Sequence, residues 1–323
     1  MSNQNTKQIN TIFAEEVREG LTQFPKTLSS KYFYDEIGDQ LFQEIMAMPS
    51  YYLTNAEFTI LMEHKKQITA HFSSKEEAFD LFELGAGDGK KTKILLRYLL
   101  KEGYKFKYRP IDISQNALAL LEANLLEELP ELVVESVQGT YFDTLKEIGE
   151  ATDKKKVILF LGSNIGNLLH PNAISFLTQL KDSMSAHDLL FMGMDQKKNP
   201  QMVLDAYNDQ EGITAAFNKN ILKRINRELG GDFNLDNFLH WEVYDPESGT
   251  AKSYLVAKKE QKVTIEALQL ELHFNAWETI HTEISQKYDD QTVAWLAGAS
   301  GLEIVTSFED QDQLFKDYLL KKK

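Results

Sequence analysis

The sequence predicts an α/β protein in which a doubly wound, Rossmann-like domain is interrupted by a second, discontinuous α+β domain. A short apolar run, residues 78–84, ends in a glycine cluster that opens a helical stretch. Strand, glycine turn and helix in this order begin a doubly wound fold. Strand-like and helix-like segments alternate to about residue 194 and again after residue 290. Between residues 199 and 288 the alternation is lost, which marks the interrupting domain.

Each element follows from the spacing of apolar residues. The predicted helices cover residues 11–21, 35–46, 54–71, 90–100, 116–126, 171–183, 201–207 and 290–296. The predicted strands cover residues 78–84, 106–111, 132–137, 156–161, 188–194, 238–244, 251–256 and 302–307. The run 156–161 is almost unbroken, which is typical of a central parallel strand that is buried on both faces.

These elements divide the chain into two domains. We expect residues 61–196 and 287–323 to form the nucleotide-type domain, and residues 1–60 and 197–286 to form the second domain. The three lysines that close the sequence, 321–323, are predicted to form a frayed, solvated tail.

Composition excludes several classes of function. The chain has 323 residues, with 35 Lys and Arg against 49 Asp and Glu, so its formal net charge is −14. Such an acidic surface repels phosphate backbones and argues against a nucleic-acid substrate. The absence of cysteine excludes disulfides and thiolate zinc sites. The seven histidines show no metal-binding spacing, so we expect no metal, and His170, His240 and His281 are predicted to be structural.

No apolar run approaches the roughly 18 residues that a membrane span needs, and the first residues lack the apolar core of a signal peptide. We therefore expect a soluble, cytoplasmic monomer that acts on a small molecule, with no membrane partner.

A glycine motif suggests the ligand. Residues 79–92 read FDLFELGAGDGKKT, and glycines let the backbone approach a ligand closely. Lys90 stands where a dinucleotide fingerprint needs its third glycine, and the spacing does not fit a P-loop. What remains, an acid followed by G-x-G-x-G at Gly85, Gly87 and Gly89, resembles motif I of class I S-adenosylmethionine-dependent methyltransferases. Glu83 would face the ammonium of the cofactor's methionine part. A glycine turn without a ligand is the simpler alternative.

A second acid lies where a ribose-binding residue is needed. Asp112 closes the next strand, about 25 residues after the glycines, where a carboxylate can accept bonds from both ribose hydroxyls. The alternative is a helix N-cap, since Ser114 and Asn116 follow. After the third strand, Thr140 and Tyr141 occupy the expected adenine position, and the usual carboxylate is missing or displaced to Asp143.

Six further segments occur in order along the chain: residues 25–38, 49–57, 160–167, 206–218, 226–229 and 280–285. With them the chain resembles, over nearly its full length, the histidine-specific Nα-methyltransferases of ergothioneine biosynthesis. The resemblance implies trimethylation of the α-amino group of free histidine with S-adenosylmethionine, and a discontinuous two-domain layout. It also implies roles for individual residues. Asn167 and Tyr207 would hold the substrate's carboxylate and amine, Tyr34, Tyr51, Glu283 and Ser285 would surround the imidazole, and Gly85, Lys91, Asp112 and Ser163 would contact the cofactor.

Two positions depart from this pattern. Ser253 stands where the histidine enzymes carry a methionine against the imidazole, and Asn164 replaces a threonine beside the amine. Ser253 could enlarge the pocket for another aromatic amino acid such as tryptophan, or it could bring a hydroxyl or a water to the ring. Glu283 and Ser285 favour imidazole, because a carboxylate would lack a partner against a phenyl ring.

We therefore expect an L-histidine Nα-methyltransferase in which Asn167 positions the amine and no residue acts as a dedicated general base. The remaining alternatives are a nicotinamide-dependent oxidoreductase and a binding module without turnover.

Overall fold

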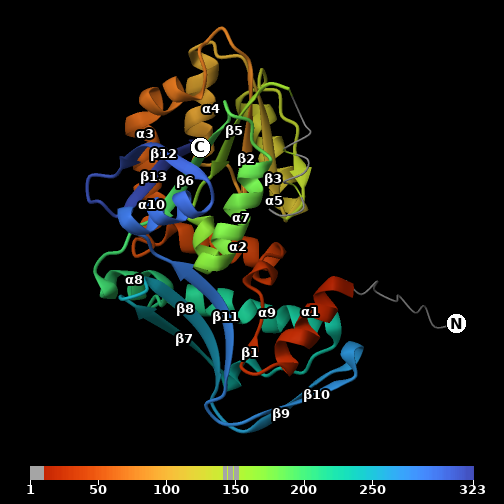
Figure 1. Ribbon diagram of the computed structural model, residues 1–323. Coiled ribbons are helices and arrows are strands. Elements are labelled where there is room, and N and C mark those ends of the chain that lie inside the picture. Colours follow the sequence, from red (N-terminus) through yellow and green to blue (C-terminus); the bar gives the residue numbers. More distant parts are fainter. Residues whose placement is uncertain (1–10, 141–143, 145–147, 149–152) are drawn as a thin grey trace, which may run out of the picture. The chain divides into compact units, whose positions relative to one another are not determined.

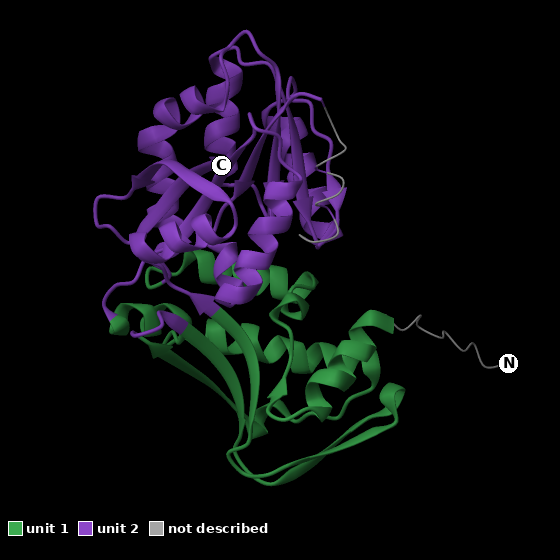
Figure 2. Cartoon of the chain, in the orientation of Figure 1, with its two compact units in different colours: residues 1–50, 200–245, 251–284 green, residues 51–199, 246–250, 285–323 purple. Residues whose placement is uncertain are grey.

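The computed structural model describes residues 11–140, 144, 148 and 153–323, which form two compact units (Figures 1 and 2). Unit 1 comprises residues 1–50, 200–245 and 251–284, and unit 2 comprises residues 51–199, 246–250 and 285–323. The expected boundary at residue 60 would cut α3 (Tyr52–Phe72), which is one continuous helix. Because Leu61, Ile68 and Phe72 pack into a core of unit 2, the whole helix belongs to that unit.

Unit 2 is built on a seven-stranded sheet with the order β12-β13-β6-β5-β2-β3-β4. Its strands are β2 (Phe79–Leu84), β3 (Phe106–Asp112), β4 (Val137–Gln138), β5 (Lys155–Phe160), β6 (Leu189–Asp195), β12 (Leu302–Glu309) and β13 (Phe315–Lys322). The pairs from β4 to β6 are parallel, whereas β13 is antiparallel to both of its neighbours. The chain moves outward from β2 through β3 and β4 and then returns to β5 on the other side of β2. The carboxyl ends of β2 and β5 therefore flank a topological switch point, where ligands bind in open α/β sheets.

Helices cover both faces of this sheet (Figure 1). Successive residues of a strand point to opposite faces, so the apolar strands present side chains to a core on each face. One core joins Phe82, Ile158 and Phe160 to the helices α7 and α10. The other joins Leu81 and Leu159 to α3, α4 and α5. Besides α3, the helices of unit 2 named here are α4 (Thr92–Lys101), α5 (Gln115–Glu128), α7 (His170–Asp182) and α10 (Asp290–Ala299). The 3₁₀ turn η2 spans Asn164–Asn167.

Unit 1 contains a four-stranded sheet with the order β1-β11-β8-β7 and a separate β9–β10 hairpin. Its strands are β1 (Lys26–Thr27), β7 (Phe238–Asp245), β8 (Thr250–Ala257), β9 (Gln261–Ile265), β10 (Leu270–Phe274) and β11 (Thr279–Gln286). The first residue of β8 and the last two of β11 belong to unit 2. Its helices are α1 (Thr11–Thr22), α2 (Glu36–Ala47), α8 (Pro200–Tyr207) and α9 (Ile213–Leu229), with short 3₁₀ turns η1 (Ser30–Phe33), η3 (Leu235–Asn237) and η4 (Glu266–Leu268). Buried and exposed residues alternate along β7, so only one face of this strand is packed.

Two sequence-based predictions were wrong. A strand was expected over residues 132–137, but β4 covers only Val137–Gln138, with one isolated bridge between Val134 and Tyr108. In the part of the chain that the structure describes, β4 lies at the edge of the sheet and pairs only with β3, so few residues are held in the sheet. The predicted lysine tail is ordered in part. Lys321 and Lys322 end β13, which lies between β6 and β12, and the Lys321 ammonium lies 3.0 Å from the Glu303 carboxylate.

Candidate active site

The glycine loop between β2 and α4 is held against β3. The Gly85 N–H donates to the Ile111 carbonyl at 2.7 Å. Gly89 has φ +64°, and a Cβ there would lie 2.4 Å from Leu121 of α5, so only glycine allows this close packing. Gly87 has φ +53° and its Cβ would meet nothing within 4 Å. The loop is therefore packed on one side and leaves open space at Gly87, as a ligand-binding turn requires.

Asp112 lies directly beside this loop, at the carboxyl end of β3. Its carboxylate accepts the Gly87 N–H at 3.0 Å and the Ser114 N–H at 2.9 Å, one on each oxygen. Burial raises the pKa of Asp112 above its ordinary value. Ser114, not Asp112, caps α5, because its hydroxyl accepts the Ala117 N–H. Each carboxylate oxygen has acceptor capacity beyond one N–H, so the residue suits the two hydroxyls of a ribose.

Glu83 is buried one residue before the end of β2. Its two oxygens accept hydrogen bonds from the hydroxyls of Thr92, at the start of α4, and Tyr108 in β3. Burial raises the pKa of Glu83 to about 7. The expected partner of this carboxylate was the cofactor's ammonium. Within the chain, Glu83 of β2 instead links β2 to α4 and to β3.

Lys91 precedes α4 and forms an ion pair with Glu57, a fully buried residue of α3. Both Glu57 oxygens also accept the Gly162 N–H, at 2.9 and 3.0 Å. Gly162 follows β5, so this carboxylate links the loops that leave β2 and β5 on the two sides of the switch point. Glu57 was not among the residues that the sequence singled out for a role of their own.

The turn after β5 carries two expected site residues and packs against the end of β11. Ser163 has a left-handed backbone (φ 57°), and Asn167 ends η2. A Cβ on Gly166 would lie 2.9 Å from the Gln286 carbonyl, so this turn packs against the end of β11, where Ser285 lies. The turn that carries Ser163 and Asn167 therefore lies against the end of β11 that carries Ser285, within unit 2.

A buried ion pair connects Ser285 to Ser163. The ammonium of Lys287 donates to the Ser285 hydroxyl at 2.8 Å and lies 2.7 Å from the Asp195 carboxylate. The Asp195 N–H donates to the Ser163 hydroxyl at 3.0 Å. Lys198 also pairs with Asp195, and burial lowers its pKa to about 8. Sequence reasoning missed Lys287, Asp195 and Lys198, because no local pattern identifies a buried charge pair.

Three further residues expected at the site, Tyr51, Thr140 and Tyr141, belong to unit 2. Tyr51 is half-buried at the N-cap of α3. The Thr140 carbonyl accepts the Thr144 N–H at 3.2 Å. Tyr141 lies outside the described residues.

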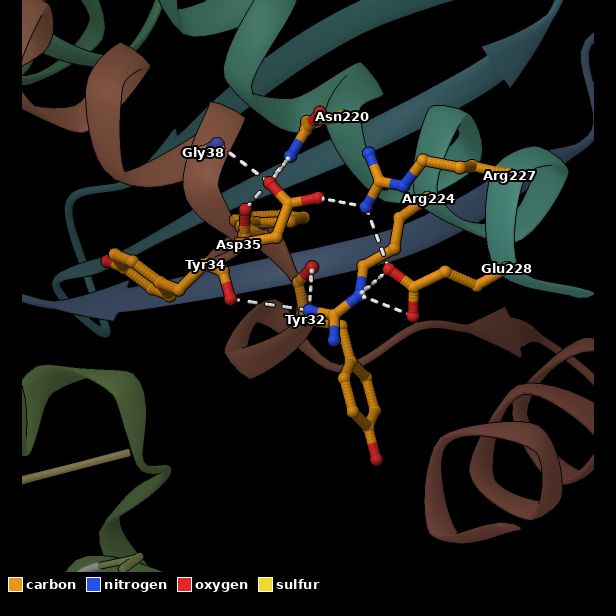
Figure 3. Close-up of polar contacts among 9 residues, drawn as sticks. Tyr32, Tyr34, Asp35, Gly38, Asn220, Arg224, Arg227 and Glu228 are labelled. Carbon is orange, nitrogen blue, oxygen red and sulfur yellow. Dashed lines mark hydrogen bonds and ion pairs between the residues drawn. The ribbon is translucent and has the colours of Figure 1, made fainter. Parts of the chain in front are cut away.

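Tyr34 follows η1 in unit 1, and its backbone is fixed by α9 (Figure 3). Arg224 donates to the carbonyls of Tyr32 and Tyr34, at 3.2 and 3.3 Å. The neighbouring Asp35 caps α2 through the Gly38 N–H and also accepts the Asn220 amide. The Tyr34 ring lies edge-on to the rings of Phe42 and Phe217, with centroids 5.5 Å apart. An expected substrate residue is thus carried on a rigid turn.

Tyr207 is the buried last residue of α8, and a histidine holds its backbone. The Asn218 amide donates to His240 Nδ1 at 2.8 Å, which leaves the proton on Nε2 to bond the Tyr207 carbonyl at 2.9 Å. Burial lowers the pKa of His240 below its ordinary value, which agrees with a neutral ring. His240 therefore supports the backbone of an expected site residue.

Ser253 and Glu283 lie on the neighbouring strands β8 and β11. Ser253 is buried, and its hydroxyl donates to the buried carboxylate of Glu242 on β7 at 2.6 Å. The Thr282 hydroxyl donates to the Ser253 carbonyl at 2.9 Å. Glu283 is half-buried. The position that departs from the histidine enzymes is therefore polar and next to a second carboxylate, Glu242, which the sequence did not reveal.

The seven expected substrate residues divide between the units: Tyr34, Tyr207, Ser253 and Glu283 lie in unit 1, and Tyr51, Asn167 and Ser285 lie in unit 2. Within the described part of the chain, no cluster of three or more His, Asp or Glu side chains could hold a metal ion. No helix among the residues described is long and apolar enough to cross a membrane.

Known proteins resemble this chain along most of its length. The profile of the family described as "Histidine-specific methyltransferase, SAM-dependent" matches residues 13–322. The chain is 35% identical over 287 residues to the histidine N-alpha-methyltransferase of Mycolicibacterium smegmatis, with 89% of this chain and 88% of that protein covered. It is 34% identical over 296 residues to the histidine N-alpha-methyltransferase of Mycobacterium tuberculosis, with 92% and 90% covered. The N-methyltransferase imqF of Aspergillus flavus is 28% identical over 307 residues, with 92% and 81% covered.

The predicted α/β fold class, the enzyme class and S-adenosylmethionine as the cofactor are thus confirmed, and the oxidoreductase alternative falls. With the profile match spanning 13–322, the chain belongs to the S-adenosylmethionine-dependent, histidine-specific methyltransferase family.

Proposed function

We propose that the chain transfers methyl groups to the α-amino group of free L-histidine, up to the trimethylated betaine. The main support is the similarity, at 35 and 34% identity over most of both chains, to two proteins named histidine N-alpha-methyltransferase. The residues expected around an imidazole, Tyr34, Tyr51, Glu283 and Ser285, are all present.

The cofactor site proposed for this reaction uses the glycine loop and its neighbours. When bound, S-adenosylmethionine would supply a sulfonium methyl group for in-line transfer to an amine, with the thioether as the leaving group. Asp112 would hold the ribose hydroxyls, Gly85 and Gly87 would allow close backbone approach, and Lys91 and Ser163 would contact the rest of the cofactor. The open space at Gly87 and the acceptor capacity of Asp112 are what make the fit physically reasonable.

The chain's contribution to the chemistry is positioning and exclusion of water. An α-amino group has a pKa of roughly 8 to 9, so a usable neutral fraction exists at neutral pH without a general base. Asn167 suits an amine that gains methyl groups, because its amide can both donate and accept hydrogen bonds. Asn167 ends the turn after β5, and the preceding residue of this turn, Gly166, packs against the Gln286 carbonyl at the end of β11.

A second candidate substrate is another aromatic amino acid, tryptophan first, because Ser253 replaces a methionine. The contacts of Ser253 weaken this alternative for phenylalanine, but not for tryptophan, whose indole carries an N–H donor. The Ser253 hydroxyl is bonded to Glu242, so the smaller side chain comes with a buried carboxyl group rather than an apolar space. A polar surrounding of this kind favours a ring that carries an N–H donor, such as imidazole or indole, over a phenyl ring, so it disfavours phenylalanine.

The test is incubation of the purified chain with methyl-labelled S-adenosylmethionine and each of histidine, tryptophan, tyrosine and phenylalanine, followed by mass spectrometry of the products. We expect mono-, di- and trimethylated histidine with the highest kcat/KM for histidine. Higher kcat/KM for tryptophan would overturn the substrate and leave the methyltransferase. No turnover with any amino acid, together with tight S-adenosylhomocysteine binding, would indicate the binding module.

We also propose that the enzyme acts as a monomer. Analytical ultracentrifugation at assay concentrations checks this, and a stable dimer would contradict it.

A further inference from the structure

The side chain of Glu57 contacts both loops proposed to hold the cofactor, the loop after β2 and the turn after β5, but no role has been assigned to it. It is fully buried on α3, pairs with the Lys91 ammonium and accepts the Gly162 N–H on both oxygens. Lys91 begins the helix that follows β2, and Gly162 begins the turn that carries Ser163. One carboxylate therefore joins three segments that are far apart in the sequence and meet at the switch point.

A second carboxyl group lies against Glu57. Asp317 is fully buried on β13, opposite Gly193 of β6. A Cβ on Gly193 would lie 2.1 Å from a Glu57 oxygen and 3.0 Å from an Asp317 oxygen, so both carboxyl groups crowd over the same glycine. Among the described residues, neither Asp317 oxygen receives a hydrogen bond from a donor group.

Two ionised carboxylates cannot share such a site, because their repulsion in a buried environment is not screened by water. Burial and the neighbouring Glu57 raise the pKa of Asp317 well above its ordinary value. A protonated Asp317 can donate its O–H to Glu57, which turns the repulsion into a hydrogen bond. The pair then carries one negative charge, which the Lys91 ammonium balances.

We propose that Glu57 is a positioning residue of the cofactor site, which sets Lys91 and the Gly162–Ser163 turn, and that a protonated Asp317 holds Glu57 in place. This inference rests on the proposed function only in taking Lys91 and Ser163 as cofactor contacts. Gly193 is part of the same arrangement, because any side chain there would displace the Glu57 carboxylate.

The alternative is that Glu57 only stabilises the fold, and unit 2 offers a matched control. Asp188 is equally buried, accepts the N–H groups of Lys156 and Ser185 at 2.7 Å each, and lies 3.1 Å from the Lys156 ammonium. It sits next to the amino ends of β5 and β6, away from the glycine loop. Glu57→Gln and Asp188→Asn therefore remove the same kind of buried charge from the two ends of the sheet.

The experiment measures S-adenosylhomocysteine binding by calorimetry, with circular dichroism to verify folding. We expect Glu57→Gln to weaken binding at least tenfold and Asp188→Asn to change it less than twofold, although both lower the melting temperature. Glu57→Asp keeps the charge but shortens the side chain, so it should also lose affinity, and it serves if Glu57→Gln does not fold. Equal affinity of Glu57→Gln, Glu57→Asp and the unmutated chain would overturn the proposal. Failure of the unmutated chain to bind would instead contradict the proposed function.

The proton on Asp317 has its own test. Asp317→Asn keeps a donor toward Glu57, so we expect affinity within about threefold of the unmutated chain, whereas Asp317→Leu should approach the loss seen for Glu57→Gln. The infrared difference spectrum between the unmutated chain and Asp317→Asn should show the carbonyl stretch of a protonated carboxyl group at neutral pH. Absence of that band would overturn the protonated pair.

Coupling shows whether Glu57 acts through Lys91. We expect the double variant Glu57→Gln/Lys91→Met to lose less affinity than the product of the two single losses. Losses that multiply would mean that the two residues act independently.

Discussion

Replacing Glu83 by glutamine removes a titratable carboxyl group from the wall beside the glycine loop while keeping its size. In the folded chain both carboxylate oxygens are taken up by the hydroxyls of Thr92 and Tyr108. Burial nevertheless dominates and raises the pKa of Glu83 from its ordinary 4.5 to about 7. The folded chain therefore holds a proton between pH 4.5 and pH 7 that the unfolded chain has already released.

This proton makes the stability of the folded chain depend on pH. Where the folded state binds more protons than the unfolded state, the free energy of unfolding falls as pH rises. The contribution of Glu83 is therefore fully present below pH 4.5, decreases between pH 4.5 and pH 7, and is constant above. A pKa rise from 4.5 to about 7, at about 1.4 kcal/mol per pH unit, corresponds to about 3 kcal/mol. Glutamine does not titrate, so Glu83→Gln should lack this dependence.

The assay is urea unfolding of both proteins at several values between pH 5 and pH 8. We expect the stability of Glu83→Gln, relative to the unmutated chain, to improve by up to about 3 kcal/mol across this interval. All other titrating groups are shared by the two proteins and cancel in the difference. A difference that stays constant, or that moves in the opposite direction, would refute the raised pKa and with it the argument that burial controls this carboxyl group.

Three further substitutions test separate parts of the site. Asp112→Ala should weaken S-adenosylhomocysteine binding at least tenfold in calorimetry, because it removes charge-assisted hydrogen bonds worth roughly 1.5–3 kcal/mol, and unchanged affinity would contradict the ribose assignment. Gly89→Ala should lower the free energy of unfolding more than Gly103→Ala does: both glycines have positive φ, at a cost of about 1–2 kcal/mol, but only the Gly89 Cβ meets a neighbour, at 2.4 Å. Glu283→Ala should reduce kcat/KM for histidine while S-adenosylhomocysteine affinity stays within about twofold; a loss confined to cofactor binding would remove Glu283 from the substrate site.

The sequence by itself predicted the elements whose pattern is local. The glycine loop, β2, β5 and most helices follow from apolar spacing and from the backbone freedom of Gly85, Gly87 and Gly89. It did not predict β13 inside the sheet. That strand ends in lysines, and its place between β6 and β12 depends on pairing with residues more than a hundred positions earlier in the chain.

Tertiary structure alone decided the buried charges. Glu57 and Asp317 are 260 positions apart, and Asp195 and Lys287 are 92 apart, yet each pair meets where the ends of strands converge. The spacing of apolar residues indicates only which face of its own helix or strand a residue occupies. An acidic residue on a helix is therefore predicted to be solvated. Whether that acid is instead desolvated, protonated or paired depends on what the rest of the chain packs against it, because burial and neighbouring charges set the free energy of ionisation.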